Sequence, residues 1–336
     1  MTGSMRKPVR IGVLGCASFA WRRMLPAMCD VAETEVVAVA SRDPAKAERF
    51  AARFECEAVL GYQRLLERAD IDAVYLPLPP RMHAEWIGKA LEAGKHVLAE
   101  KPLTTTASDT ARLVGLARRK NLLLRENYLF LHHGRHDVVR DLLQSGEIGE
   151  LREFVAVFGI PPLPDTDIRY RTELGGGALL DIGVYPARAA RLFLSGPLTV
   201  VGASSHEAQE SGVDLSGSAL LQSEGGTVAH LGYGFVHHYR SAYELWGSRG
   251  RIVIDRAFTP PAEWQAVIRI ERKGVVDELS LPAEDQVCKA VTAFARDIRA
   301  EAGVDDTAVA ADSGESMIQQ AVLVEAIGQA RRCRST

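Results

Sequence analysis

The sequence lacks the signatures of proteins that bind nucleic acids or membranes. Lys and Arg together number 40 against 43 Asp and Glu, and no dense basic block occurs. A nucleic-acid site or an anionic-lipid anchor normally shows as a basic stripe, so we expect neither partner. No apolar run approaches the ~20 residues that cross a bilayer, and the first residues contain no apolar core of a signal peptide. We therefore expect a cytoplasmic protein with no membrane association.

Cysteines are few, with five in 336 residues. They are Cys16, Cys29, Cys56, Cys288 and Cys333. An odd number of scattered cysteines without CxxC spacing is typical of buried or incidental thiols in a reducing compartment, not of a disulfide framework or a zinc site. Histidines cluster near residues 132–136 and 237–238, without a carboxylate or cysteine at ligand spacing. We predict no metal site and surface positions for these histidines.

The length of the chain exceeds one ordinary core, so we expect two domains of roughly 100–200 residues each. In the first part, apolar strands at 9–14, 35–40, 73–78 and 96–99 alternate with helical segments. Near-continuous apolar strands separated by helices indicate a parallel sheet covered on both faces. We predict an α/β protein whose N-terminal domain, residues 5–125, is a Rossmann-type doubly wound sheet.

The pattern changes beyond residue 125. A strand at 151–158 and a run of short strands between 199 and 281 follow one another with few helices, and helical segments at 284–301 and 312–331 end the sequence. Short links imply an antiparallel or mixed sheet with helices on one face only. We predict a C-terminal α+β domain, residues 126–336, with a large, open-faced, mostly antiparallel sheet. A second copy can cover the open face, so we expect a homo-oligomer, a dimer or tetramer.

A glycine turn after the first strand is the candidate cofactor site. Gly15 holds the first position of a G-x-G-x-x-G pattern, and alanines replace the other two glycines. A turn between a strand and a helix directs backbone N–H groups and the positive end of the helix dipole at a pyrophosphate. The alternative is a purely structural turn with two solvated arginines. The predicted cofactor contacts here are Gly15, Ala17, Ser18, Phe19, Ala20, Trp21, Arg22 and Arg23.

The end of the second strand distinguishes NADP from NAD. An acidic side chain there binds the ribose 2′-OH of NAD, whereas arginine accommodates a 2′-phosphate. Ser41 and Arg42 occupy this place, and a hydroxyl beside a guanidinium suits a phosphate. Asp43 is the competing NAD-type acid, but its better role is to cap the helix that follows. The sequence therefore favours NADP(H) as the cofactor.

Three further motifs extend this pattern along the chain. They are Leu76-Pro77-Leu78-Pro79-Pro80-Arg81-Met82-His83, Glu100-Lys101-Pro102, and Gly175-Gly176-Gly177 with Asp181, Gly183 and Tyr185. Together with the glycine turn and Ser41-Arg42, they resemble the Gfo/Idh/MocA oxidoreductases over nearly the whole chain. Only the set is specific, because each motif alone is common.

The resemblance places the family's catalytic lysine at Lys101 and its acid/base position at Tyr185, where many members have histidine. Neutral His, with a pKa of about 6.5, can take a proton from an alcohol at pH 7, whereas Tyr, with a pKa of about 10, is better placed to donate one. Tyr185 therefore favours reduction of a ketone. A lysine ammonium against the ketone oxygen stabilises the alkoxide that develops. Both residues are also predicted substrate contacts, and which of them delivers the proton stays open.

Three more residues are candidates near the reacting carbonyl. Asp181 lies four residues before Tyr185 and shares its helix face if the helix is continuous, so it is a candidate for orienting Lys101 or a substrate hydroxyl. Gly183 and Pro186 lie within that helix and argue against continuity. Arg169 and Tyr170 precede the glycine triplet, where they can meet a diphosphate or sugar.

The resemblance also implies cofactor contacts after the third and fourth strands. Leu76, Pro77 and Leu78 follow the third strand and belong to this set. His83 matches a family position near the pyrophosphate or the nicotinamide ribose, although a helix-cap or packing role is an alternative. Glu100 either bounds the nicotinamide pocket or pairs with a cation.

The implied activity is NADPH-dependent reduction of the C3 ketone of a dTDP-linked 3,4-diketo-2,6-dideoxy sugar, as in ketoreductases of this family that serve antibiotic deoxysugar pathways. One alternative is an NAD(P)-dependent dehydrogenase of a free sugar or polyol, which a histidine at position 185 would favour. Another is a non-catalytic, cofactor-sensing regulator, which would not need Lys101 and Tyr185.

Overall fold

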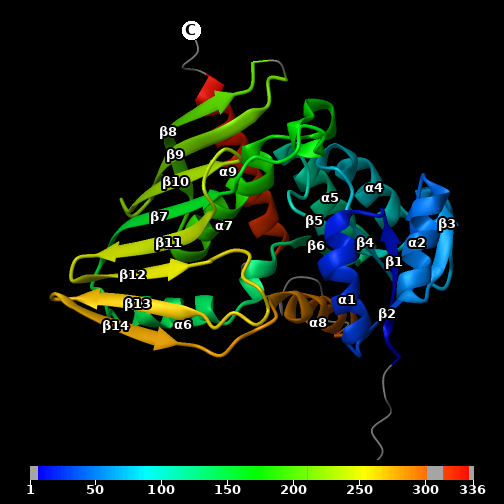
Figure 1. Ribbon diagram of the computed structural model, residues 1–336, viewed down its shortest axis with the longest axis horizontal. Coiled ribbons are helices and arrows are strands. Elements are labelled where there is room, and N and C mark those ends of the chain that lie inside the picture. Colours follow the sequence, from blue (N-terminus) through cyan, green and yellow to red (C-terminus); the bar gives the residue numbers. More distant parts are fainter. Residues whose placement is uncertain (1–6, 210, 301–312, 333–336) are drawn as a thin grey trace, which may run out of the picture. The chain divides into compact units, whose positions relative to one another are not determined.

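The computed structural model describes residues 7–209, 211–300 and 313–332 (Figure 1). Cys333 and the predicted helix limits at residues 301 and 312 lie outside this part. The described residues form two compact units. The first comprises 7–104, 108–127, 287–300 and 313–318, and the second comprises 105–107, 128–209, 211–286 and 319–332.

The first unit contains a six-stranded parallel sheet with the order β3-β2-β1-β4-β5-β6. Its strands are β1 (Val9–Leu14), β2 (Thr34–Ser41), β3 (Glu57–Leu60), β4 (Ala73–Leu76), β5 (His96–Glu100) and β6 (Leu124–Asn127). This is the strand order of the doubly wound dinucleotide-binding fold, whose ligands bind at the carboxyl ends of the strands where the order reverses. The predicted Rossmann-type sheet is confirmed.

The helices of this unit begin and end where the local sequence directs. They are η1 (Ala20–Met24), α1 (Leu25–Asp30), α2 (Pro44–Phe54), α3 (Tyr62–Leu66), α4 (Pro80–Glu92), α5 (Ala107–Lys120) and α8 (Gln286–Arg299). Asp43 caps α2, because its Oδ1 accepts hydrogen bonds from the N–H groups of Ala45 and Lys46 at 3.0 and 3.3 Å. The predicted cap is therefore confirmed.

Helix α8 belongs to the first unit although it lies late in the sequence. The Arg299 guanidinium donates through Nη2 to the carbonyl oxygens of Lys7 and Glu33 at 2.8 and 3.0 Å. Asp297 accepts from Arg125 on β6 at 3.2 Å. The return of this segment to the first unit was not expected from the sequence pattern.

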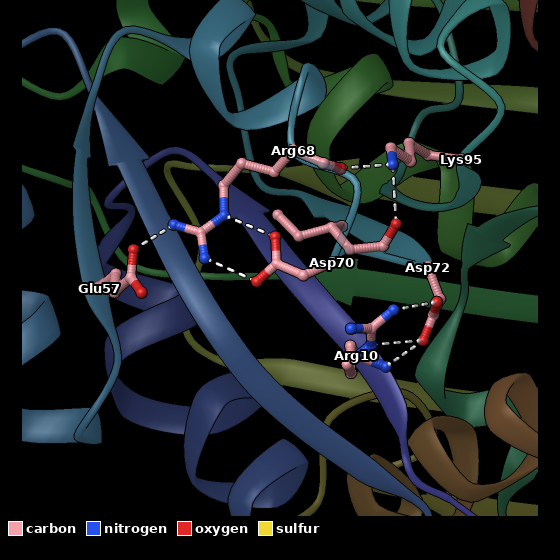
Figure 2. Close-up of polar contacts among 7 residues, drawn as sticks. Arg10, Glu57, Arg68, Asp70, Asp72 and Lys95 are labelled. Atoms are coloured by element: carbon pink, nitrogen blue, oxygen red, sulfur yellow. Dashed lines mark hydrogen bonds and ion pairs between the residues drawn. The ribbon is translucent and has the colours of Figure 1, made fainter.

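A polar cluster lies at the amino-terminal edge of the first sheet, opposite the edge that binds ligands (Figure 2). Arg10, early in β1, donates to the Asp72 carboxylate through Nε and Nη2 at 3.3 and 3.1 Å and through its backbone N–H at 2.9 Å. The buried Lys95 ammonium donates to the carbonyl oxygens of Arg68 and Ile71 at 2.7 and 2.8 Å. These bonds fix the chain that enters β4 and β5.

The second unit contains an eight-stranded sheet with the order β14-β13-β12-β11-β7-β10-β9-β8. Its strands are β7 (Leu151–Gly159), β8 (Leu198–Glu207), β9 (Asp214–Ser223), β10 (Val228–Gly234), β11 (Arg240–Gly247), β12 (Gly250–Asp255), β13 (Val267–Arg272) and β14 (Val275–Ser280). Only the pairing of β7 with β10 is parallel in this sheet, and the other pairs are antiparallel. The predicted mostly antiparallel sheet is confirmed.

Helices cover one face of this second sheet. The helical segments of this unit are η2 (Leu129–His132), α6 (Arg135–Gln144), η3 (Ile168–Tyr170), η4 (Thr172–Leu174), η5 (Leu179–Gly183), α7 (Val184–Phe193) and α9 (Gly314–Arg332). Val139 of α6, Ala187 of α7 and Ile327 of α9 share one buried cluster with Leu245 of β11. The next residue of that strand, Trp246, points to the other face and is 54% exposed.

The expected surface position is wrong for two of the histidines. His133 and His136 are buried beneath the second sheet, where His136 Nδ1 lies 2.8 Å from the Tyr243 hydroxyl and burial holds the pKa of His136 well below its usual value. Among the described residues, no group of three or more His, Cys, Asp or Glu side chains is arranged to hold a metal ion. Across that same part of the chain, no helix combines the length and the apolar character needed to span a bilayer.

Candidate active site

The glycine turn lies at the carboxyl end of β1, beside the end of β4. Gly15 has a φ of 120°, a conformation that favours glycine. A Cβ on Gly15 would lie 2.8 Å from Leu78 Cδ2, closer than atoms of this kind approach. Its N–H donates to the Ala40 carbonyl of β2 at 3.0 Å. The turn is therefore tight, because it combines a positive φ with close packing of the Leu78 side chain against the glycine backbone.

The helix after the turn opens with a wide, π-helical turn. Ala20 is fully buried, as a residue at the tightly packed third position of the glycine pattern should be. Trp21 packs against Phe50 and Phe54 with ring centroids 4.8 and 5.6 Å apart, and Arg53 lies over its ring at 4.3 Å. The side chain of Trp21 thus supports α2.

The remaining predicted contacts of this turn are more open. Ser18 and Arg22 are exposed, and Ala17, Phe19 and Arg23 are half-buried. Arg22 donates from Nε to the Ser18 carbonyl at 3.4 Å, so its guanidinium folds back over the turn. An exposed cation at the start of a helix is unfavourable for the helix dipole unless an anion is bound there.

The end of β2 presents the features that a 2′-phosphate requires. Ser41 is buried and its Oγ accepts the N–H of Asp43 at 3.0 Å, while the carboxylate of Asp43 is used in the helix cap. Arg42 is exposed and lines a cavity of about 530 Å³ together with Tyr62 and Trp86. This cavity therefore offers a cation and aromatic rings beside the predicted ribose position.

His83 lies inside the first unit, not on its surface. The ring is fully buried, with Nδ1 2.8 Å from the Pro102 carbonyl and Nε2 2.7 Å from the Leu78 carbonyl. Burial lowers its pKa. His83 therefore ties the segment Leu76-Pro77-Leu78 after β4 to the segment after β5, which favours the packing alternative over a direct contact with the cofactor.

Glu100 and Lys101 lie at the end of β5, on the same edge of the sheet as the glycine turn. Glu100 Oε1 accepts hydrogen bonds from the Tyr75 hydroxyl and from Asn127 Nδ2, both at 2.8 Å. Burial raises the pKa of Glu100 despite these donors. Lys101 is half-buried and joined to Pro102 by a cis peptide bond. Two neutral donors thus hold Glu100 and fix the backbone that presents Lys101.

Tyr185 belongs to the second unit and lies on α7. Its ring is 8% exposed and is surrounded by the rings of Tyr128, Phe130, Phe158 and Phe258, with centroids 5.8, 6.1, 5.2 and 5.6 Å away. Offset and edge-on aromatic contacts at these distances are favourable and directional. The orientation of the phenol is therefore set by packing on several sides.

Asp181 and Tyr185 lie on one unbroken helix, because the π turn η5 continues directly into α7. Asp181 Oδ2 accepts from Arg169 Nε at 2.6 Å, and Arg169 Nη1 donates to Asp167 at 3.2 Å. The charge of Asp181 raises the pKa of Arg169, although burial opposes it. Arg169 is thus engaged by two carboxylates.

Tyr170 likewise has a structural role in its own segment. Its hydroxyl accepts the Leu163 N–H at 2.9 Å, and its ring lies edge-on to Phe235 at 6.1 Å. The contacts of Tyr170 therefore hold the proline-rich segment in place.

The sequence did not identify three residues that support these sites. Tyr75 and Asn127 hold Glu100, and Asp214 accepts the Leu179 N–H at 2.7 Å at the start of the helix that carries Tyr185. For Asn127, its place at the end of a short strand after Leu124-Arg125-Glu126 was a signal that the sequence offered. Asp214 is the first residue of β9, and nothing in the sequence around it indicated a role in the site.

Two family models match the chain. The oxidoreductase family model with an NAD-binding Rossmann fold matches residues 9–128, and the GFO/IDH/MocA C-terminal domain model matches residues 136–253. A relative from Saccharopolyspora spinosa, named dTDP-3,4-didehydro-2,6-dideoxy-alpha-D-glucose 3-reductase, is 95% identical over 99% of this chain and 100% of its own. The chain belongs to the Gfo/Idh/MocA family. The family resemblance inferred from the motifs is confirmed.

A further relative and a solved structure carry reductase descriptions as well. A reductase of that name from Actinomadura kijaniata is 53% identical over 86% of this chain and 87% of its own. The crystal structure of the KijD10 3-ketoreductase from that organism, in complex with NADP and TDP-benzene, matches with a TM-score of 0.92 and 50% identity over 96% of this chain and 98% of that one. Other structures of KijD10 carry a replacement of one lysine or of one tyrosine.

Proposed function

We propose that the protein reduces the C3 ketone of dTDP-3,4-didehydro-2,6-dideoxy-α-D-glucose with NADPH. The observation that carries this function is the 95% identity, over essentially the full length of both chains, to a reductase of that name. The protein is an NADP-dependent oxidoreductase, since KijD10, a 3-ketoreductase of the same fold, binds NADP. The cofactor expected from Ser41 and Arg42 agrees with this assignment.

The first unit fits the cofactor on its own geometry. Gly15 takes the positive φ of the turn after β1, where Leu78 packs against its backbone, and the exposed Arg42 can pair with a 2′-phosphate. Glu100, held by neutral donors, lies on the same edge of the sheet, where the nicotinamide pocket is expected. When bound, NADPH supplies the hydride for the substrate carbon.

In the proposed mechanism, Lys101 and Tyr185 act on the substrate oxygen. As the C3 carbonyl becomes an alcohol, negative charge develops on its oxygen. The Lys101 ammonium stabilises that charge, and the Tyr185 hydroxyl donates the proton that completes the alcohol. The lysine and tyrosine replaced in the KijD10 structures stand one number higher in that chain than Lys101 and Tyr185 do here, which supports the assignment.

Asp181 and Arg169 have supporting roles in this proposal. Their ion pair, with Asp167, fixes the segment before the glycine triplet in the second unit, where we propose that the sugar nucleotide binds. We propose that Tyr170 acts in the same way through its bond to Leu163.

The test is a direct assay of the purified protein. With the dTDP-linked 3,4-diketo sugar and NADPH, absorbance at 340 nm (the NADPH band) should fall, and the product should carry a hydroxyl at C3. The control replaces the sugar nucleotide by underivatised sugars with NADP+. Absence of NADPH consumption with the diketo sugar, or faster turnover of the free sugars, would reject the proposed reduction and favour the dehydrogenase alternative.

We also propose that the open face of the second sheet pairs with another copy to give a dimer or tetramer in the cytoplasm, where the protein serves an antibiotic deoxysugar pathway. Trp246 lies on this face among the salt bridges of Arg251 with Glu244 and Glu271. Light scattering at micromolar concentration should give a multiple of the chain mass. Trp246→Glu should shift the mass toward that of one chain, and a monomeric wild-type protein would refute this assembly.

A further inference from the structure

The helix that carries Tyr185 begins in an unusual way. Gly175 and Gly177 have φ values of 80° and 123°, and the π turn η5 follows with no side-chain cap from its N-cap residue, Ala178. The first N–H groups of a helix need acceptors from elsewhere. Here one acceptor comes from a distant strand, because Asp214, the first residue of β9, accepts the Leu179 N–H through Oδ2 at 2.7 Å.

Asp214 also forms a buried ion pair with the end of another helix. Its Oδ2 lies 2.7 Å from Nη1 of Arg331, and the side chains are 5% and 11% exposed. The carboxylate lies at the start of the helix that carries Tyr185, and the guanidinium lies in the last turn of α9. Each charge therefore has the sign that the adjacent helix dipole favours. The pair joins the two helix ends within the second unit.

The surrounding glycines show how closely this arrangement is packed. A Cβ on Gly177 would lie 2.3 Å from Asp214 Oδ1, so the carboxylate lies directly against the glycine backbone. A Cβ on Gly183 would lie 2.9 Å from Cγ of Tyr233 on β10. The segment from Gly177 to Tyr185 is thus held by a carboxylate at its start, by a ring beneath its middle, and by the aromatic cluster at its end.

We infer that Asp214 is a positioning residue for the reduction, which it serves by fixing the start of the helix that places the Tyr185 hydroxyl, while Arg331 balances its charge. This inference rests on the proposed function, in which Tyr185 donates the proton. Proton donors lose efficiency when displaced by about 1 Å, even by changes far from the reacting atoms. Neither residue needs to touch the substrate for this role.

The experiment compares two double variants that lack both charges, so that no buried charge is left alone. Asp214→Asn with Arg331→Met keeps an amide oxygen that can accept the Leu179 N–H, whereas Asp214→Ala with Arg331→Met removes it. A matched control, Asp137→Asn with Arg140→Met, removes a more exposed ion pair of the same unit, on α6. Each protein is assayed for kcat with the diketo sugar, for NADPH affinity by fluorescence, and for hydrogen exchange at residues 178–186.

We expect the alanine variant to lose about tenfold or more in kcat relative to the asparagine variant, with NADPH affinity unchanged and faster exchange confined to residues 178–186. The control should match wild type. Equal kcat and equal exchange in the two Asp214 variants, or an equal loss in the control, overturns the inference. If the alanine variant does not fold, Asp214→Val with Arg331→Met takes its place, because valine also lacks an acceptor for the Leu179 N–H and suits the start of a strand. A wild-type protein without reductase activity rejects the proposed function, while the exchange data still decide whether Asp214 fixes the helix.

Discussion

Replacing Arg42 by alanine should weaken the binding of NADPH and leave the binding of NADH nearly unchanged. Arg42 is exposed at the end of β2, and the neighbouring carboxylate of Asp43 is turned toward the first N–H groups of α2. Arg42 is therefore the cation available to a 2′-phosphate at this strand end, and NADH has no such phosphate.

The magnitude follows from the exposure of Arg42. A hydrogen bond to a charged group contributes about 1.5–3 kcal/mol, and solvent screening at an exposed site favours the lower end of that range. A loss of about 1.5–2 kcal/mol corresponds to a rise of roughly 10- to 30-fold in the Kd for NADPH. The effect should shrink as salt is added, because the pair is exposed to solvent.

The assay is a fluorescence titration of both dinucleotides at low and physiological salt. Arg112→Ala is a suitable control, since Arg112 is an exposed arginine on α5 that pairs with Asp109 and does not line the Arg42 cavity. Equal changes in the affinities for NADPH and NADH, or an unchanged Kd for NADPH, would refute the assignment of Arg42 to the 2′-phosphate.

Three further predictions concern catalysis and stability. Tyr185→Phe should lower kcat by about 100-fold with little change in NADPH affinity. Tyr170→Phe, the control, should affect kcat far less. Equal losses of kcat in the two variants would contradict the assignment of Tyr185 as the proton donor. Asp72→Asn should lower the free energy of unfolding in urea by about 1 kcal/mol at pH 7 after allowance for its partial exposure. Burial alone would raise the pKa of Asp72, but the hydrogen bonds and charge of Arg10 lower it overall. The stabilisation by this pair is therefore present above about pH 4 and should disappear as acid protonates the carboxyl in the folded protein. A difference in unfolding free energy between Asp72→Asn and wild type that persists in acid would be evidence against this pair. Burial lowers the pKa of His136. The free energy of unfolding should therefore fall below about pH 6.5, by up to about 1.4 kcal/mol per pH unit for each such histidine. His136→Gln should reduce that slope, and an unchanged slope would show that the histidine is not neutral in the folded protein.

The central strands of the first sheet were predictable because a parallel sheet is buried on both faces. Residues such as Ile11, Val13 and Val74 are fully buried, so the sequence must be apolar throughout these strands. Two strands were missed for opposite reasons. β3 is an edge strand with largely exposed residues, and β6 consists of buried but mostly polar residues that hold Glu100 and pair with α8.

The sequence offers candidate residues for the site, but it does not show their partners. Lys101 and Tyr185 follow recognisable motifs, whereas Asp214 acts across 35 residues of sequence through one hydrogen bond to Leu179. His133 precedes α6 and His136 lies in its first turn, in a sequence whose histidines we expected at the surface. Tertiary packing beneath the second sheet buries both histidines, and local sequence carries no signal for that.

The late contribution of α8 to the first unit constrains the order in which the protein can assemble during synthesis. The segments of the first unit up to Asn127 emerge from the ribosome early. Arg299, which donates hydrogen bonds to the carbonyl oxygens of Lys7 and Glu33, is translated more than a hundred residues afterwards. Until Arg299 is translated, the strands of the second sheet are an insertion in a first unit that is still incomplete. A nascent chain halted before residue 287 would therefore hold the dinucleotide fold in an incomplete and protease-sensitive state.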